Sequence, residues 1–249
     1  MNERYSRNRL YVNNSEQSII KNYPILLAGC GIGSNIAECA LRFGFENITL
    51  IDGDIVERSN LNRQNFTEKN LQQNKAQTLY KRLKEINPEA DIKYISDFID
   101  HNNVNKILKN IKIAFNALDF TSDIPVIFDE IAQKKGIVII HPYNLGWAGL
   151  VTAIHPNGQN FQILGHNKQL NELKVVDFVM EELAQKEKEV SWLAKIVNDY
   201  KNEQETLPPP QLSIGSWLVA GMCTTLLYKI ATEKKSRYFP EFYFKTIAD

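Results

Sequence analysis

The chain has 249 residues, and its 29 basic and 29 acidic side chains give a formal net charge of zero. This balance lacks the basic excess typical of nucleic-acid binders, and the length suits one large α/β domain. The three cysteines form no Cys-x-x-Cys pair, so we expect neither a structural zinc site nor a disulfide framework. The polar amino terminus lacks a signal-peptide pattern, and no apolar run approaches the roughly 20 residues of a membrane span. We therefore expect a cytoplasmic protein that does not enter a membrane.

The first part of the chain alternates between apolar runs and segments with helical spacing. Residues 1–23 are predicted as an amino-terminal arm or short helix. The strands that follow are predicted at Ile25–Ala28, Ile48–Ile51, Ile92–Ile95, Ile113–Leu118 and Ile137–Ile140. The helices are predicted at Ser34–Phe43, Lys75–Asn87, Asn103–Leu108 and Ile124–Lys135. This alternation predicts a Rossmann-like, doubly wound, mostly parallel sheet with helices on both faces.

The pattern changes after His141. A strand and turn are predicted over residues 149–158, and the charged stretch Val175–Tyr200 is predicted to be helical. Three prolines at 208–210 end a polar segment. A helix from Ser213 to about Thr232 and a strand over Phe242–Thr246 are expected to extend the sheet. The single domain then has four parts: an arm (1–23), a nucleotide-binding core (24–156), a crossover or mobile region (157–212), and a carboxyl-terminal helix and strand (213–249).

A glycine-rich turn, Ala-Gly-Cys-Gly-Ile-Gly-Ser at residues 28–34, follows the first predicted strand. Gly31 and Gly33 would let the backbone approach a phosphate closely, and the helix after them would point free N–H groups at that anion. A tight strand-to-helix turn without any ligand produces the same pattern. The turn alone is therefore a weak indication of a nucleotide site.

An acidic residue follows the second predicted strand. Asp52 lies about twenty residues after the glycine turn, where a Rossmann-type domain holds the hydroxyls of a ribose. Asp54 is close enough in sequence to assist a metal or to fix the loop, and the alternative is that it only forms the turn together with Gly53. The sequence leaves these roles of Asp54 open.

The next polar residues suit a bound triphosphate. Arg63 can hold phosphate oxygens in a bidentate fork, with Asn60 beside it, and Lys75 can neutralise charge on a leaving group. Taken alone, Arg63 would be a surface ion pair and Lys75 a solvated helix residue. Asp119 follows the predicted strand Ile113–Leu118, at the edge where open α/β sheets bind ligands, and could hold Mg²⁺. A helix cap is the alternative role for Asp119.

The combination of these motifs resembles the ThiF/MoeB/HesA family, the prokaryotic relatives of ubiquitin-activating enzymes. The resemblance covers nearly the whole chain, and its most specific part is Ser-Asn-Leu-Asn-Arg-Gln at residues 59–64. Residues 4–8 (Arg-Tyr-Ser-Arg-Asn) and 210–216 (Pro-Gln-Leu-Ser-Ile-Gly-Ser) also resemble family motifs. The expected fold is therefore a single ThiF/MoeB-like domain.

The resemblance implies an ATP-dependent adenylyltransferase. In this family, the C-terminal glycine carboxylate of a small ubiquitin-like or sulfur-carrier protein ending in Gly-Gly attacks the α-phosphate of ATP, giving an acyl-adenylate and pyrophosphate. Asp52 would bind the ribose, Asn60, Arg63 and Lys75 would handle the phosphates, and Asp119 would bind Mg²⁺. Arg7 resembles the family arginine that reaches the ATP site of a partner subunit, which implies a homodimer. The alternative for Arg7 is an exposed residue in a frayed arm.

The chain also departs from the family pattern. Aligned on Gly31 and Gly33, Ala28 and Cys30 replace two of the usual glycines, and Cys30 is expected to add a side chain near the phosphate path. A second alignment counts Gly29 and Gly31, with Ser34 in the third place. No arginine follows Asp119, and the paired zinc motifs of many relatives are missing.

Cysteine usage bears on the mechanism. Residues 157–212 contain no cysteine, and Cys223 is expected to pack within a helix. We therefore expect adenylation without a thioester on this chain.

Three other functions remain open. The same chemistry could act on a peptide or on a carboxylate of a modified tRNA nucleoside, although the neutral charge disfavours tRNA. The chain could be a catalytically inactive nucleotide-binding partner in a heterodimer. An NAD-dependent oxidoreductase is the weakest alternative, because it leaves Asn60, Arg63 and Lys75 without a role.

Overall fold

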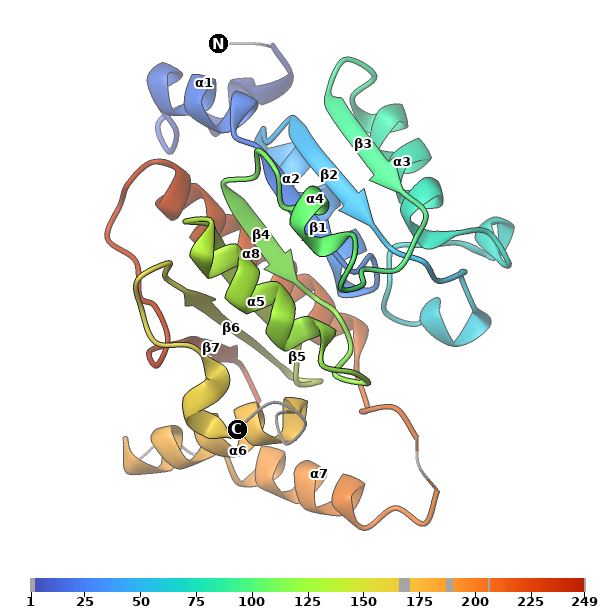
Figure 1. Cartoon of the computed structure of the whole chain (residues 1–249), viewed down its shortest axis with the longest axis vertical. Coiled ribbons are helices and arrows are strands. Elements are labelled where there is room, and N and C mark those ends of the chain that lie inside the picture. Colours follow the sequence, from blue (N-terminus) through green and yellow to red (C-terminus); the bar gives the residue numbers. More distant parts are fainter. Residues whose placement is uncertain (1–2, 166–170, 187–189, 206, 249) are drawn as a thin grey trace.

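The computed structural model describes residues 3–165, 171–186, 190–205 and 207–248, which form one seven-stranded sheet. The strand order is β3-β2-β1-β4-β5-β6-β7 (Figure 1). The strands are β1 (Ile25–Ala28), β2 (Asn47–Ile51), β3 (Asp91–Ile95), β4 (Ile113–Asn116), β5 (Val138–Asn144), β6 (Ala148–Ile154) and β7 (Tyr243–Thr246). Neighbouring strands from β3 to β5 are parallel, whereas β6 and β7 pair antiparallel. The doubly wound, mostly parallel sheet with a carboxyl-terminal extension is therefore confirmed.

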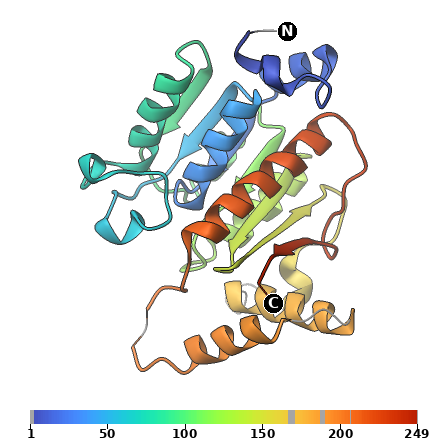
Figure 2. The same ribbon diagram turned by 180° about the vertical axis from the view of Figure 1, so that it is seen from behind.

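Helices cover both faces of this sheet (Figures 1 and 2). One face carries α2 (Ile32–Phe43), α3 (Lys75–Ile86) and α8 (Ser213–Ala231). The other carries α4 (Val104–Ile107) and α5 (Ile124–Lys134), and its apolar core continues into α6 (Glu172–Gln185) and α7 (Ser191–Lys201). The arm consists of η1 (Glu3–Asn8) and α1 (Asn14–Asn22), and the remaining short 3₁₀ helices are η2 (Arg58–Asn60), η3 (Glu68–Asn70) and η4 (Phe161–Leu164).

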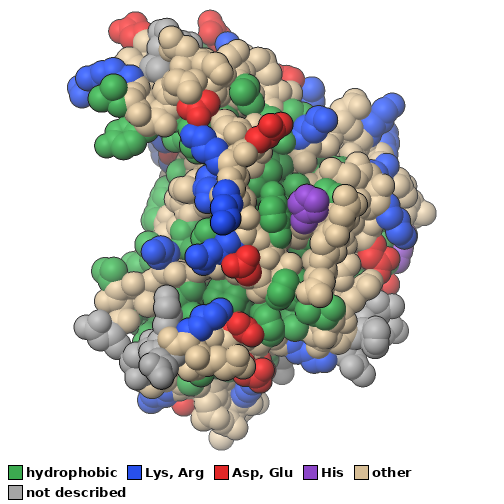
Figure 3. All heavy atoms as spheres, turned by 90° about the vertical axis from the view of Figure 1, so that its left-hand side faces the viewer, with side chains coloured by type: hydrophobic (Ala, Val, Ile, Leu, Met, Phe, Trp, Pro, Cys, Tyr) green, Lys and Arg blue, Asp and Glu red, His purple; other side chains and the backbone are tan. Residues whose placement is uncertain are grey.

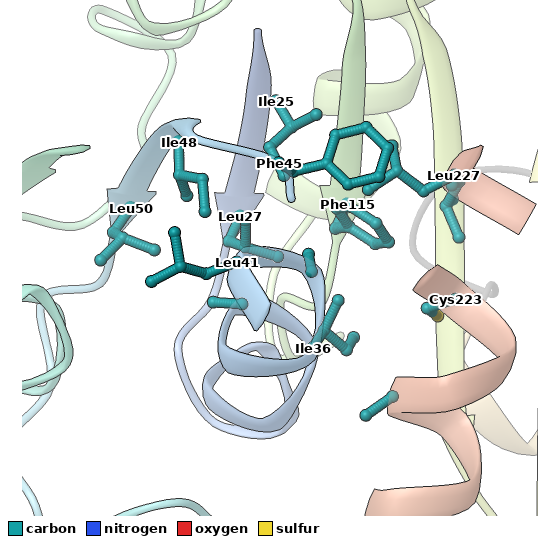
Figure 4. Close-up of a cluster of buried hydrophobic side chains, with 14 of the residues drawn as sticks. Ile25, Leu27, Ile36, Leu41, Phe45, Ile48, Leu50, Phe115, Cys223 and Leu227 are labelled. Carbon is teal, nitrogen blue, oxygen red and sulfur yellow. The ribbon is translucent and has the colours of Figure 1, made fainter. Parts of the chain in front are cut away.

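The strand β1 lies inside the sheet between β2 and β4, and all four of its residues are buried. Side chains alternate along a strand, so Leu27 enters the core beneath α2 whereas Leu26 enters the core on the opposite face. Figure 4 shows the first of these cores, where Leu27 and Phe115 from the sheet point toward Ile36 of α2 and Cys223 of α8. This packing holds the amino end of α2 against the carboxyl end of β1.

Most predicted elements are present with shifted ends. The strand predicted to end at Ile140 continues to Asn144 despite Pro142. Beyond Ile140, β5 no longer pairs with β4, and β6 is its one neighbour among the described strands. A proline is tolerated at such an edge because the ladder does not require its missing N–H. The predicted helix over Val175–Tyr200 is two helices, and residues 187–189 between them lie outside the described residues.

Helix α8 contradicts one expectation. Its 19 residues are long and apolar enough to cross a membrane by length and composition, so the statement that no run approaches that length was wrong. Half of its apolar window, 50%, is buried in this structure, and it packs against α2, β5 and β6. Small residues on the buried face, such as Ala220 and Gly215, allow this close packing. Its composition is accounted for by its place in the core.

Candidate active site

The carboxyl ends of β1, β2 and β4 open into a cavity of ≈ 850 Å³, here called the polar cavity. The carboxyl edge of a parallel sheet is the usual ligand position in open α/β folds. The polar cavity is lined by seven of the predicted site residues: Gly31, Asp52, Asp54, Asn60, Arg63, Lys75 and Asp119. Two predicted residues, Gly33 and Arg7, do not line it. Chain segments far apart in sequence therefore meet at the carboxyl edge of the sheet, where the nucleotide is predicted to bind.

The glycine turn forms the floor of the polar cavity. Gly29 has a φ of +93°, and a Cβ there would collide with the carbonyl oxygen of Ala117, so this position requires glycine. Gly31 precedes α2, whose first turn has no side-chain cap, which leaves its amino end suited to an anion. Gly33 lies inside α2 and packs on Leu27. The structure thus brings Gly29 and Gly31, but not Gly33, to the cavity. This agrees with the second alignment to the family pattern, which counts Gly29 and Gly31.

The expectation that Cys30 would crowd the phosphate path was wrong. Its side chain is fully buried in the core beneath α2, with Sγ 3.8 Å from the carbonyl oxygen of Ile51. The reason is the backbone of the turn, which directs the side chain inward and the N–H outward. That N–H donates to Asp52 Oδ2 at 2.7 Å. The residue therefore links the glycine turn to the acid through its main chain.

Asp52 accepts two backbone hydrogen bonds, one on each carboxylate oxygen. Oδ2 accepts from Cys30 N, and Oδ1 accepts from Asp54 N at 2.8 Å. Burial raises the pKa of Asp52 above its ordinary value, while the Cys30 N–H and the charge of Lys75 oppose that shift. Each oxygen keeps lone pairs beyond these bonds, which is the acceptor capacity that a ribose diol needs.

Lys75 is the first residue of α3 and lies largely buried, with 8% of its surface exposed. Its Nζ is 3.0 Å from Asp54 Oδ2, and its backbone N–H donates to Asp54 O at 2.9 Å. Of the roles left open for Asp54, fixing the loop therefore matches the geometry. The ion pair holds the ammonium at the cavity wall, where a phosphate could compete for it.

Arg63 is held by the segment that follows the three prolines. Its Nε donates to Gln211 Oε1 at 2.7 Å, and its Nη1 donates to Ser59 O at 2.8 Å. Burial lowers the pKa of Arg63, and the negative charge of Asp119 opposes this effect. The neighbouring Asn60 is 7% exposed, and its Oδ1 accepts from Glu57 N, so this oxygen is engaged within the loop.

Two lining residues escaped the sequence analysis. Gln211 belongs to a segment 148 residues from Arg63, and no local pattern predicts that pairing. Glu172 begins α6, lines the polar cavity, and accepts the N–H of Phe120 at 3.1 Å. The position of Gln211 directly after Pro210, inside a motif that resembles the family, was the one available signal.

Asp119 is exposed and lies in the loop after β4. The described residues contain no cluster of three or more His, Cys, Asp or Glu side chains that could hold a metal by itself. Mg²⁺ bound to nucleotides usually takes one or two carboxylates and completes its octahedron with phosphates and waters. A carboxylate facing a polar cavity fits that donor set, and it does not supply the thiolate and imidazole ligands typical of a structural zinc site.

Arg7 lies at the opposite end of α2. The residues around it are anchored there, since Asn8 Nδ2 donates to Phe43 O at 2.8 Å and Tyr5 Oη donates to Leu41 O at 3.4 Å. The twelve residues of α2 span roughly 18 Å at 1.5 Å per residue, so Arg7 does not reach the polar cavity of its own chain.

A comparison with known families matches residues 5–247 to the ThiF family. The chain belongs to the ThiF family. The match takes in both the nucleotide-binding core and the carboxyl-terminal helix and strand, so the family fold accounts for the whole sheet.

Several ThiF-family relatives are similar over part of the chain. The sulfur carrier protein ThiS adenylyltransferase of Bacillus subtilis (strain 168) is 29% identical over 162 residues, which are 63% of this chain and 48% of that protein. The tRNA threonylcarbamoyladenosine dehydratase of Escherichia coli (strain K12) is 35% identical over 97 residues, 39% of this chain and 36% of that protein. The match therefore spans about half or less of these relatives.

Solved structures share the fold. Escherichia coli MccB with ATP superposes with a TM-score of 0.71 at 18% identity, covering 99% of this chain and 72% of MccB. PaaA superposes with a TM-score of 0.68 at 18% identity, covering 94% of this chain and 64% of PaaA. The ThiF-family architecture is thus retained at low sequence identity.

The three cysteines of this chain lie in or against its apolar core. Cys223 and Cys30 are both fully buried, and burial raises the pKa of each thiol well above its ordinary value. Burial also raises the pKa of Cys39, which packs against the core beneath α2. A buried neutral thiol is a poor nucleophile, which matches the packing role expected for Cys223.

Proposed function

We propose that this ThiF-family chain is an ATP-dependent adenylyltransferase that activates a carboxylate as an acyl-adenylate. The observation that carries the proposal is the convergence of Asp52, Arg63, Lys75 and Asp119 on one polar cavity beside the amino end of α2. An acceptor for ribose, two cations for phosphates and a carboxylate for Mg²⁺ are the groups this chemistry needs. An oxidoreductase would use only the glycine turn and Asp52.

The residues of the proposed site have two kinds of role: some bind the nucleotide, and others stabilise the charge that develops in the reaction. Asp52 and the uncapped amino end of α2 hold the nucleotide, and Asp119 together with the phosphates would hold Mg²⁺, which when bound neutralises phosphate charge. A carboxylate oxygen attacks the α-phosphorus, a new P–O bond forms, and the bond to the bridging oxygen of the β-phosphate breaks. Arg63 and Lys75 stabilise the negative charge that grows on the leaving pyrophosphate.

The carboxylate that accepts the adenylyl group is proposed in the same class as the relatives' substrates. The similarity to a sulfur carrier protein ThiS adenylyltransferase supports the C-terminal carboxylate of a small ubiquitin-like or sulfur-carrier protein. The similarity to tRNA threonylcarbamoyladenosine dehydratases favours, as a second candidate, a carboxylate on a modified tRNA nucleoside. The buried cysteines support release of the adenylate without a thioester on this chain.

Exchange of labelled pyrophosphate into ATP tests the proposal, with candidate carrier proteins, peptides and tRNA supplied in turn. Asp119→Ala should lower exchange at least about 100-fold, because it removes the carboxylate proposed to hold the metal. Asp123→Ala is the matched control: this neighbouring acid pairs with His101 and does not line the polar cavity. Full exchange by Asp119→Ala would refute the metal role.

The same assay separates the alternatives. An inactive partner subunit would bind ATP but show no exchange with any acceptor. Binding of NAD without binding of ATP would overturn the assignment of the polar cavity.

A further inference from the structure

A second cavity adjoins the polar cavity and differs from it in character. It has a volume of ≈ 430 Å³ and lies between the β5–β6 turn, helices α6 and α7, and residues 209–212. The two cavities share Leu118, Asp119 and Phe120, so they meet at the carboxylate proposed to bind Mg²⁺. We call this second space the apolar chamber. Its volume falls within the roughly 300–1,000 Å³ typical of sites for small organic groups.

The walls of the apolar chamber come mainly from aliphatic side chains. Helices α6 and α7 supply Val176, Leu193, Ile196 and Val197, and Trp147 stands partly exposed at the β5–β6 turn, with 49% of its surface accessible. A water-filled space of this composition is unfavourable, because burial of apolar surface from water is the dominant stabilising effect in binding. The chamber therefore suits an apolar group.

We infer that the apolar chamber receives the acyl half of the substrate: a large apolar side chain next to the activated carboxylate. This inference rests on the proposed function, since the shared wall at Asp119 places the reacting carboxylate between nucleotide and chamber. A Gly-Gly tail has no side chain to fill the chamber. The preferred substrate is therefore a polypeptide C-terminus that ends in a large apolar residue.

Sulfamoyladenosines test this inference, because they mimic an acyl-adenylate and cannot transfer the acyl group. Three probes are compared by calorimetry on the full chain: N-acetylphenylalanyl-sulfamoyladenosine, N-acetylglycyl-sulfamoyladenosine and unacylated sulfamoyladenosine. The phenylalanyl probe should bind at least about tenfold more tightly than the glycyl probe, in the range known for apolar pockets. Equal affinity of these two would overturn the inference while leaving the proposed function intact. Failure of all three to bind would overturn the proposed function itself.

Two tryptophan substitutions on α7 make the test specific to the chamber. Ile196→Trp introduces a bulky ring at a lining position that is 43% exposed and therefore tolerant of change. It should abolish the preference for the phenylalanyl probe. Ala194→Trp places the same ring at an exposed position of α7 that does not line the chamber, and it should retain the preference. Retention of the preference by both variants would contradict the assigned location.

Discussion

At the scale of single residues, the ribose-binding role that we propose for Asp52 would link nucleotide binding to the protonation of this carboxylate. Its carboxylate is partly withdrawn from water, accepts two backbone N–H groups and faces the charges of Lys75 and Asp54. Burial is the largest effect and raises the pKa of Asp52. The acid therefore takes up a proton at a higher pH than an exposed aspartate does, and the protonated form accepts fewer hydrogen bonds from a ribose.

We predict that adenosine, which carries no titrating phosphate, binds more weakly as the pH falls through the raised pKa of Asp52. Stability should respond in the opposite sense: a folded-state pKa above the unfolded value means that this residue stabilises the fold more at low pH and less as the pH rises through that interval. Asp52→Asn should bind adenosine about tenfold more weakly, as expected for loss of a charged acceptor, and show no pH dependence in this interval. Calorimetry over a pH series provides the measurement, and an unchanged pH profile in Asp52→Asn would exclude the assigned role.

Single residues also show which parts of the site can be predicted from sequence. Asp52, Arg63 and Lys75 stand in motifs whose spacing is local, and the polar cavity contains all three. The inward direction of Cys30 is not predictable in this way, because the backbone of the turn sets it. Gln211 reaches Arg63 only through the tertiary path of the crossover segment. Residues whose role depends on long-range packing therefore require the structure.

At the scale of elements, the β1–α2 unit places its backbone at the position where we propose that phosphate binds. Two glycines in this unit differ in backbone conformation and in the space available for a Cβ atom. Gly29 has a left-handed φ of +93° and touches Ala117, whereas an added Cβ at Gly33 would meet Leu27 at 3.9 Å, an ordinary contact distance. The sequence leaves both alignments of this turn open. The positive φ of Gly29, which the sequence does not reveal, favours the alignment that counts Gly29 and Gly31.

We predict that Gly29→Ala lowers the free energy of unfolding by roughly 1–3 kcal/mol, because alanine is strained at this φ and its Cβ crowds the carbonyl oxygen of Ala117 in the loop after β4. Gly33→Ala should cost little or add a few tenths of a kcal/mol, because alanine favours a helix over glycine. Chemical denaturation of both variants measures the difference. Equal stability of the two would show that the turn relaxes around Gly29.

Strand and helix types were largely predictable because their apolar patterns are strong; Ile25–Ala28, for example, is a continuous apolar run typical of a strand buried on both faces. The extent of β5 was not predictable, because a proline usually ends a strand. The structure shows that Pro142 pairs with β6 alone, beyond the last residue that pairs with β4, so its missing N–H breaks no bond to β4. Apolar composition likewise could not separate a core helix from a membrane span in α8.

At the scale of the whole molecule, several apolar side chains remain uncovered. Leu10 and Tyr11 of the arm are 98% and 85% exposed, and α8 leaves Trp217 51% exposed. Figure 3 shows one side of the molecule, where apolar and basic side chains lie interspersed and the outline is hollowed between its upper and lower parts. Exposed apolar area of this kind marks interaction surfaces. A second copy of the chain is the occupant we expect, because Arg7 is held a full helix length away from its own polar cavity.

We therefore predict that Arg7 acts on the polar cavity of a partner subunit. Arg7→Ala and Asp119→Ala should each be inactive in pyrophosphate exchange when tested alone. Mixed dimers of the two contain one site with both residues intact, so an equal mixture after subunit exchange should recover about one quarter of wild-type activity. A mixture of Arg7→Ala with Arg7→Gln, in which every site lacks this cation, controls for nonspecific rescue by added protein. Activity in the Arg7→Ala variant alone, or no recovery on mixing despite dimers in solution, would place Arg7 outside the reaction and leave it as an exposed residue of the arm.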